Sequence, residues 1–258
     1  MKRSIPVLLI TIWMLSVVLA PGRVGAATVR LAAAASMTDA VRELIQAFTA
    51  AHPGVTIQPN FASSGSLAKQ IIQGAPVDLY ISANQRWMNW LVENRAIDPG
   101  TARILAHNAL VFIGPSTTRA RTMLDLTSLA RIGIGSPKSV PAGQYAAQAM
   151  ENAGIYRQLL EDRCLVMAKD VRQALLYADR GEVDGAFVYR TDARLARKST
   201  VLFTVPPELH DPVSYPIGLT PEGRQNPEAR AFYSFATGPL AAGILKSYGF
   251  TPPEGEQR

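Results

Sequence analysis

Apolar residues in this chain follow two alternating spacings, one typical of buried strands and one typical of helices. Short, nearly continuous apolar runs predict strands that are covered on both faces of a sheet. The predicted strands are Thr28–Ala32, Val55–Phe61, Val77–Ser82, Ala109–Ile113, Ile132–Gly135, Leu165–Met167, Gly185–Tyr189, Val201–Val205 and Tyr215–Leu219.

Most of the segments between these strands repeat apolar residues every third or fourth position, as one face of a helix does. These helical segments are Ala40–Phe48, Leu67–Ile72, Trp87–Leu91, Tyr145–Asn152, Val171–Arg180, Ala229–Ala236 and Leu240–Tyr248. Regular alternation of strand and helix predicts an α/β fold whose mainly parallel sheets are flanked by helices. The length of 258 residues suits one or two such lobes.

Residues 1–26 show the order of charged, apolar and small residues that is typical of a secretory signal peptide. Lys2 and Arg3 precede an apolar run from Ile5 to Ala20, and small residues lead up to Ala26. We therefore predict export, with cleavage after about Ala26.

A transmembrane anchor is the alternative interpretation of this segment. A spanning helix needs about 20 apolar residues, whereas this run is shorter and lies between Pro6 and Pro21. The only cysteine, Cys164, is far from the cleavage point, which argues against a lipid anchor. A single cysteine also leaves an exported chain without an internal disulfide.

Removal of the predicted signal peptide lowers the positive charge of the chain. The whole sequence has 26 Lys and Arg against 20 Asp and Glu, a formal net charge of +6. Three of these basic residues, Lys2, Arg3 and Arg23, lie in the signal segment, so the remaining chain has 23 basic and 20 acidic residues and a charge of +3. This mild charge, without a long basic block, argues against nucleic acid as a partner.

Four short stretches rich in small and capping residues each precede a predicted helix: Ala34–Asp39, Phe61–Gly65, Val140–Gly143 and Lys169–Arg172. The first N–H groups of a helix have no partner within that helix. Several helix starts that point to one place can therefore hold an anion without Arg or Lys. In such sheets these loops follow the carboxyl ends of strands, where ligands bind. Tyr189, at the end of a predicted strand, adds a phenol donor there.

Each of these signals also has a plain structural interpretation. Ser36, with Asp39 three residues later, is placed to cap the helix that follows, and Ser64 is placed similarly. Asp170 is better explained as a helix cap than as a ligand contact, because a carboxylate repels an anion. Tyr189 taken alone fits an ordinary core tyrosine.

Catalytic motifs are absent from the sequence. It has no phosphate-binding loop and no G-x-S-x-G motif, and Gly133–Gly135 lacks the third glycine of a dinucleotide fingerprint. His52, His107 and His210 do not have metal-ligand spacing. A secreted hydrolase using Ser64 would need a general base that the sequence does not offer, so we predict a protein that is not an enzyme and needs no cofactor.

Taken together and in order, these stretches resemble the periplasmic molybdate-binding proteins of ABC importers. The resemblance covers essentially the whole chain after residue 26. The matching strings are AAASMTDA (Ala33–Ala40), FASSGSLA (Phe61–Ala68), GAPVDLYISA (Gly74–Ala83), VPAGQY (Val140–Tyr145), DVRQAL (Asp170–Leu175), VYRTDA (Val188–Ala193) and YGF (Tyr248–Phe250). The sequence departs from the usual family pattern at Asn84 and Ser136.

The resemblance implies a two-lobed periplasmic binding protein of type II that closes on a tetrahedral oxyanion. Lobe 1 would comprise residues 27–107 and 217–258, and lobe 2 residues 108–216. The implied contacts with molybdate, whose molybdenum is bound only as the oxyanion, are Ser36, Ser64, Ala142, Val171 and Tyr189.

By the same resemblance, the chain is expected to be a monomer that binds molybdate or tungstate and delivers it to a membrane permease with a cytoplasmic ATPase. The alternative is a binding protein of the same fold for sulfate, phosphate or an organic acid.

Overall fold

The computed structural model describes residues 27–253 of the chain. The predicted signal peptide and its cleavage after Ala26 lie outside these residues. Within the described part, no helix is long and apolar enough to cross a membrane.

The first of two five-stranded sheets has the strand order β2-β1-β3-β10-β4. β1 is parallel to β2 and β3, whereas β10 is antiparallel to both β3 and β4. The strands are β1 (Ala27–Ala34), β2 (Val55–Ala62), β3 (Leu79–Ile81), β4 (Arg103–His107) and β10 (Ser214–Leu219). Its helices are α1 (Thr38–Ala51), α2 (Ser64–Ile72), α3 (Gln85–Glu93), α8 (Pro221–Gln225), α9 (Pro227–Ala236) and α10 (Pro239–Ser247).

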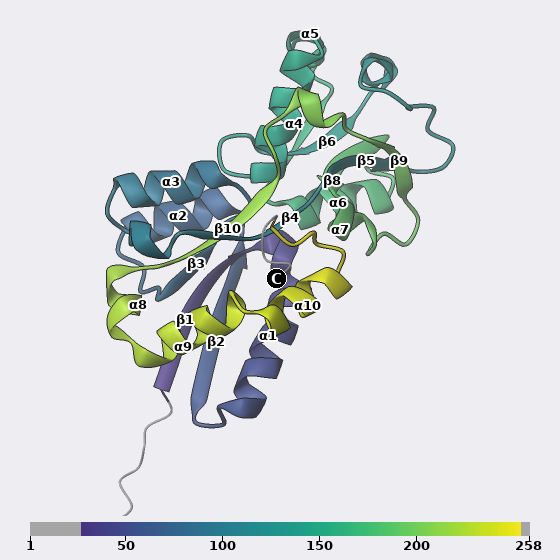
Figure 1. Ribbon diagram of the computed structural model, residues 1–258. Helices are drawn as coiled ribbons and strands as arrows, with labels where there is room; N and C mark the ends of the chain where they lie inside the picture. The colour runs from purple at the N-terminus through teal and green to yellow at the C-terminus, as the bar shows by residue number, and fades with distance from the viewer. Residues whose placement is uncertain (1–26, 254–258) are drawn as a thin grey trace, which may run out of the picture.

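Alternation of side chains along β1 gives this sheet two covered faces. Leu31 and Ala33 belong to the core that includes residues of α1 and α9, whereas Ala32 packs in a second cluster with residues of α2 and α3. Figure 1 shows these helices on either side of the sheet. Covering both faces explains why the strand is apolar at almost every position.

The second sheet has the order β7-β6-β8-β5-β9, with β6 parallel to β7 and β8, and with β5 antiparallel to β8 and β9. α4 and α6 lie on either side of it (Figure 1). The strands are β5 (Leu110–Gly114), β6 (Ile132–Gly135), β7 (Leu165–Ala168), β8 (Gly185–Tyr189) and β9 (Thr200–Thr204). The helices are α4 (Pro141–Asn152), α5 (Tyr156–Glu161), α6 (Val171–Asp179) and α7 (Arg190–Ala193).

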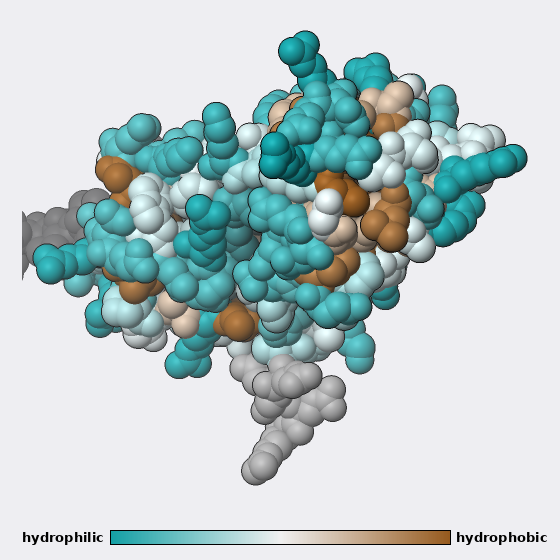
Figure 2. All heavy atoms as spheres, turned by 90° about the horizontal axis from the view of Figure 1, so that it is seen from above, coloured by the Kyte–Doolittle hydropathy of each residue, from teal (hydrophilic) through white to brown (hydrophobic). Residues whose placement is uncertain are grey.

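Short 3-10 helices complete the described chain: η1 (Ala35–Met37), η2 (Pro99–Thr101), η3 (Leu124–Ser128) and η4 (Pro207–Leu209). We call the first sheet with its helices the first lobe and the second sheet with its helices the second lobe. The molecule in Figure 1 is accordingly divided into two halves joined by connecting segments. Hydrophilic residues cover most of the face seen in Figure 2, and hydrophobic residues form small separate patches on it.

Both sheets are mixed, because one strand in each runs against the other four. β10 and β5, the reversed strands, are the first strands after the chain passes from one lobe to the other. The pattern analysis did not predict β4, in which Leu105 and Ala106 are buried but Arg103 and Ile104 are exposed. Such a short half-exposed strand has no clear apolar run.

The chain passes between the lobes twice, once between β4 and β5 and once between β9 and β10. The predicted lobe limits of 27–107 with 217–258, and 108–216, remain a prediction. In the register of the first sheet, β10 already starts at Ser214, which is opposite His107. Pairing with β4 therefore draws Tyr215 and Pro216 into the first sheet.

Candidate functional site

A small cavity between the lobes brings together all five residues that the sequence singled out. It is lined by Ala34, Ala35, Ser36, Ser63, Ser64, Ala83, Val140, Pro141, Ala142, Asp170, Val171 and Tyr189. Its volume is about 10 Å³, close to the ~10–15 Å³ that a single water needs on the same measure. The lobes therefore lie close together around this site.

The strand register explains why two serines meet there. β1 and β2 are parallel and pair up to Ala34 opposite Ala62, so that both strands end at the same edge of the sheet. Ser36 and Ser64 each lie two residues beyond that last pair. Parallel strands thus deliver two hydroxyl groups from distant parts of the sequence to one point.

Ser36 does not cap a helix, contrary to the plain structural interpretation. It lies inside η1, and the residue before α1 is Met37, which makes no side-chain cap. The Ser36 side chain instead accepts a hydrogen bond from the Tyr215 hydroxyl, with 3.1 Å between Oη and Oγ. The Ser36 hydroxyl therefore makes no hydrogen bond to the backbone N–H groups at the start of α1.

Ser64 does not cap a helix either, because Ser63 is the residue that caps α2. The Ser63 Oγ accepts from the backbone N–H of Ser66 at 3.4 Å. Ser64, the first residue of α2, is fully buried and its Oγ accepts from the backbone N–H of Ala83 at 2.9 Å. With its oxygen already accepting, the Ser64 hydroxyl is left with a hydrogen to donate.

Ala142 and Val171 lie in the first turns of α4 and α6, where backbone N–H groups have no intrahelical acceptor. Pro141 occupies the first position of α4, a position that suits its missing N–H. Asp170 caps α6, as predicted, by accepting from the Gln173 N–H at 2.9 Å. Both helix starts direct the positive ends of their dipoles at the cavity.

Tyr189 ends β8 and lies almost completely buried at the cavity. Its hydroxyl donates to the carbonyl oxygen of Ala83 in the first lobe at 3.5 Å. Burial raises the pKa of the phenol well above its ordinary value, with smaller contributions from Tyr215, Tyr145 and Asp192. The hydroxyl therefore keeps its hydrogen and is a neutral donor, here to Ala83. To bind an anion in the cavity, that hydrogen would have to turn away from Ala83.

Arg172 approaches the site without lining it, a role that the sequence analysis missed. Its Nη2 lies 2.9 Å from Asp39 Oδ2 and 3.3 Å from the carbonyl oxygen of Ser36, both in the first lobe. Its Nε lies 2.6 Å from Asp192 Oδ1. Asp39 offsets the guanidinium charge, and Asp192 adds to this when it is ionised. The described cavity lining contains no Lys, Arg or His.

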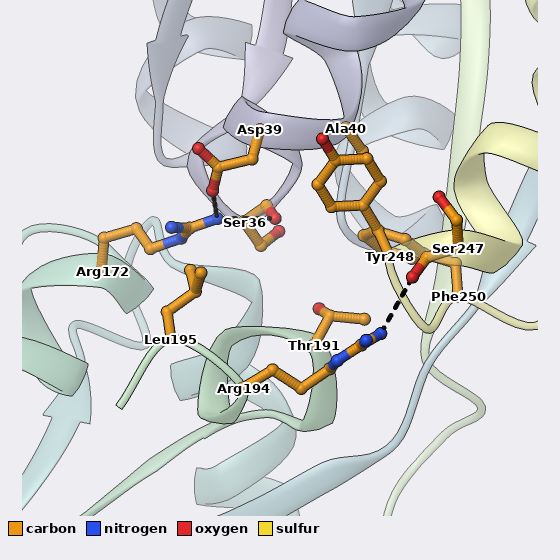
Figure 3. Close-up of a pocket in the computed structure, with 10 residues that line it drawn as sticks. All are labelled: Ser36, Asp39, Ala40, Arg172, Thr191, Arg194, Leu195, Ser247, Tyr248 and Phe250. Atoms are coloured by element: carbon orange, nitrogen blue, oxygen red, sulfur yellow. Dashed lines mark hydrogen bonds and ion pairs between the residues drawn. The ribbon is translucent and has the colours of Figure 1, made fainter. Parts of the chain in front are cut away.

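A second, larger cavity of about 280 Å³ adjoins the first and shares Ser36 with it. Figure 3 shows Arg172 and Asp39 facing each other across one side of it, and Arg194 reaching toward Ser247 on the other. Nowhere in residues 27–253 do three or more His, Cys, Asp or Glu side chains gather as they would around a bare metal ion.

Asn84 and Ser136, the two departures from the family pattern, take structural positions. Asn84 Nδ2 donates to Gln144 Oε1 across the lobes at 2.6 Å, and its Oδ1 caps α3 by accepting from the Trp87 N–H. The backbone of Ser136 bonds to Ala168 and Val140 in the turn before α4. Neither residue lines the small cavity.

Comparison with known proteins identifies the family to which this chain belongs. The family model described as bacterial extracellular solute-binding protein matches residues 29–251. The molybdate-binding protein ModA of Escherichia coli is 39% identical over 227 residues, which cover 85% of this chain and 87% of that protein. A putative ABC transporter substrate-binding lipoprotein of Bacillus subtilis, YvgL, is 33% identical, over 87% of this chain and 86% of that protein.

Solved structures share the fold. The periplasmic molybdate-binding protein of Azotobacter vinelandii superposes with a TM-score of 0.77 at 22% identity, covering 88% of this chain and all of that one. The sulfate-binding protein SubI of Mycobacterium tuberculosis superposes with a TM-score of 0.74 at 18% identity, covering 88% of each chain. These superpositions confirm the predicted two-lobed fold.

Proposed function

We propose, from the premise that this chain belongs to the bacterial extracellular solute-binding protein family, that it binds molybdate in the periplasm and delivers it to an ABC importer. Tungstate, which has the same charge and nearly the same size, is proposed as a second ligand. The permease and its cytoplasmic ATPase are the proposed partners of a monomeric binding protein.

The observation that carries this proposal is the convergence of neutral donors from both lobes on one buried cavity. Ser36 and Ser64 approach from the first lobe, while Ala142, Val171 and Tyr189 approach from the second. Hydrogen bonds to a charged partner contribute roughly 1.5–3 kcal/mol each. Several such bonds, with two helix dipoles, can offset the desolvation of an oxyanion.

Closure then depends on the ligand, because only the closed state brings both sets of donors to the anion. A cavity walled by donors favours an ion with oxygen acceptors on all sides and no hydrogen of its own. By the resemblance to the molybdate-binding family, we expect molybdate and tungstate to be preferred over the smaller sulfate.

A binding protein of the same fold for sulfate or phosphate is the second candidate, and it is supported by the superposition on the sulfate-binding protein of M. tuberculosis. A hydrolase using Ser64 has no support in the cavity, because its lining holds no histidine and the Oδ1 of Asp170 caps α6. An ester-hydrolysis assay on the purified protein is expected to show no turnover.

A thermal-shift panel tests the proposal directly. A ligand present at 100 times its dissociation constant adds about 2.7 kcal/mol to the free energy of unfolding. We expect molybdate and tungstate to raise the melting temperature of the purified exported protein, and sulfate and phosphate at equal concentration to have little effect. A shift with sulfate or phosphate but none with molybdate or tungstate would overturn the assignment.

A further inference from the structure

We propose that Tyr215, held by Asn108, is a positioning residue that orients the Ser36 hydroxyl as a donor to the bound anion and thereby discriminates against ions that carry hydrogen. The inference rests on the proposed function of the cavity. It assigns a role to two residues that do not line the cavity.

A row of hydrogen bonds connects the crossing segment between the lobes to the cavity. Asn108 lies between β4 and β5, and its Nδ2 donates to the Tyr215 hydroxyl oxygen at 3.4 Å. The Tyr215 hydroxyl donates in turn to Ser36 Oγ at 3.1 Å. Ser36 is the member of this row that lines the cavity.

The direction of the row is set at its first residue. The backbone N–H of Ala109 donates to Asn108 Oδ1 at 2.9 Å, which fixes that atom as the amide oxygen. The amide nitrogen therefore faces the other way, where it donates to Thr191 Oγ1 at 2.9 Å as well as to Tyr215. An amide nitrogen cannot accept a hydrogen bond, so the Tyr215 oxygen must be the acceptor here.

The Tyr215 hydroxyl is fully buried, and a buried hydroxyl hydrogen requires an acceptor. Among the described residues, the acceptor that the structure gives it is Ser36 Oγ. Burial raises the pKa of the phenol well above its ordinary value, so that the hydrogen stays in place. Ser36 Oγ thus accepts from Tyr215, and its own hydrogen is left to point at the anion.

The Ser64 hydroxyl is also left with its hydrogen to donate, but for a different reason. Its oxygen accepts a hydrogen bond from the backbone N–H of Ala83 rather than from a side chain. No substitution other than proline removes that donor. The donor behind Ser36 is a side chain, so the direction of the row can be reversed by mutation.

Asn108→Asp provides the reversal. A carboxylate at this position accepts a hydrogen bond from the Tyr215 hydroxyl. The Tyr215 oxygen then accepts a hydrogen bond from the Ser36 hydroxyl. The Ser36 hydrogen is therefore no longer available to the anion. We expect the dissociation constant for molybdate, measured by titration calorimetry at neutral pH, to rise at least about tenfold, the equivalent of a lost bond to a charged partner.

The double variant Asn108→Asp/Tyr215→Phe separates reversal from simple charge repulsion. Without the phenol, the carboxylate has no connection to Ser36, and we expect binding to recover at least about fivefold relative to Asn108→Asp alone. Binding as weak as in the single variant would show that the negative charge itself causes the loss, and would overturn the proposal.

Tyr215→Phe alone tests the selectivity, and it does not depend on the stability of the Asn108→Asp variant. Ser36 can then rotate and accept a hydrogen, and inorganic phosphate carries at least one hydrogen at neutral pH. We expect the ratio of the phosphate and molybdate dissociation constants to fall at least about threefold, a change in differential affinity that a merely looser cavity would not produce. An unchanged ratio would contradict the proposal.

Tyr145→Phe is the matched control, because Tyr145 is also a buried phenol but donates to the carbonyl oxygen of Pro212 at 3.3 Å. We expect it to leave the ratio unchanged. Titration of the unmodified protein separates the two proposals. If it binds sulfate and not molybdate, the proposed function fails, and the same double variant measured with sulfate still tests the direction of the row.

Discussion

At the scale of single residues, Ser36 and Ser64, two of the three serines that line the cavity, do not cap a helix as serine often does at a helix start. Ser63, one residue before Ser64, caps α2. Ser36 lies within a 3-10 turn, and the cap position of α1 is occupied by Met37. The sequence places serines near both helix starts, but it does not show which one caps. That distinction depends on where each helix begins, to within one residue.

Removal of a single hydroxyl from the cavity is expected to weaken binding of the anion. Tyr189→Phe and Ser36→Ala each lose one bond to charge, so the dissociation constant for molybdate should rise about tenfold or more in calorimetry. Tyr233→Phe is the control, because its hydroxyl donates to Thr101 away from the cavity. Unchanged affinity in both cavity variants would remove Tyr189 and Ser36 from the site.

At the scale of elements, α4 reaches the cavity because two glycines let it lie against the end of β6. A methyl group built on Gly143 would overlap the carbonyl oxygen of Gly135, and one built on Gly135 would overlap the side chain of Val140. This close approach places the N–H of Ala142 at the cavity. The sequence marks Val140–Gly143 as a turn into a helix, but it does not show that Gly135 faces it.

Gly143→Ala is therefore expected to destabilise the protein. The added methyl group must push α4 away from β6, and overpacking of this kind costs typically 1–3 kcal/mol. Urea denaturation measures the change in the free energy of unfolding.

Gly243→Ala is the matched control in α10, because a methyl group there meets no atom within 4 Å. It should stabilise the protein by roughly 0.5–1 kcal/mol through its higher helix propensity. Equal effects of the two substitutions would contradict the packing argument.

At the scale of the whole molecule, the closed arrangement is held by contacts between the lobes around the cavity. The N–H of Gly65 donates to the carbonyl oxygen of Ser139 at 2.9 Å, and Asn84 donates to Gln144. Arg172 of α6 reaches Asp39 of the first lobe while it also faces Asp192. The protonation state of Asp192, the buried member of this group, therefore bears on both stability and closure.

The Asp192 carboxyl gives the stability a distinctive dependence on pH. Burial raises its pKa to about 7 against the opposing effect of Arg172, and Asp39 raises it slightly further. Between its ordinary value of 3.8 and about 7, the folded state binds a proton that the unfolded state lacks. The free energy of unfolding contributed by this group therefore falls as pH rises through that window.

Asp192→Asn should remove this contribution. We expect the unfolding free energy, measured by urea denaturation across that pH range, to fall less steeply in the variant than in the unmodified protein. Asp162→Asn, at an exposed carboxylate of the second lobe, should keep the original slope. Parallel curves for the unmodified protein and Asp192→Asn would contradict the raised pKa.

Local patterns predicted most of the fold, because buried parallel strands are apolar along their length and helices repeat with their own period. They did not predict β4, or the direction of β5 and β10, because direction depends on how the chain crosses between lobes. They identified residues that meet at the cavity through helix starts. The bond between Tyr215 and Ser36 joins positions 179 apart in sequence, and no local pattern connects such a pair.

The helix starts of α4 and α6 have a consequence for how this site can change over evolutionary time. In the proposed site, Ala142 and Val171 act through the amide that every amino acid except proline carries. The side chains at these positions can therefore change by genetic drift while the backbone N–H groups still donate to the anion. Two related proteins could therefore bind the same ion with different residues at these positions. A comparison of amino-acid identities there would not reveal the shared site, whereas a comparison of the directions of the backbone amides would.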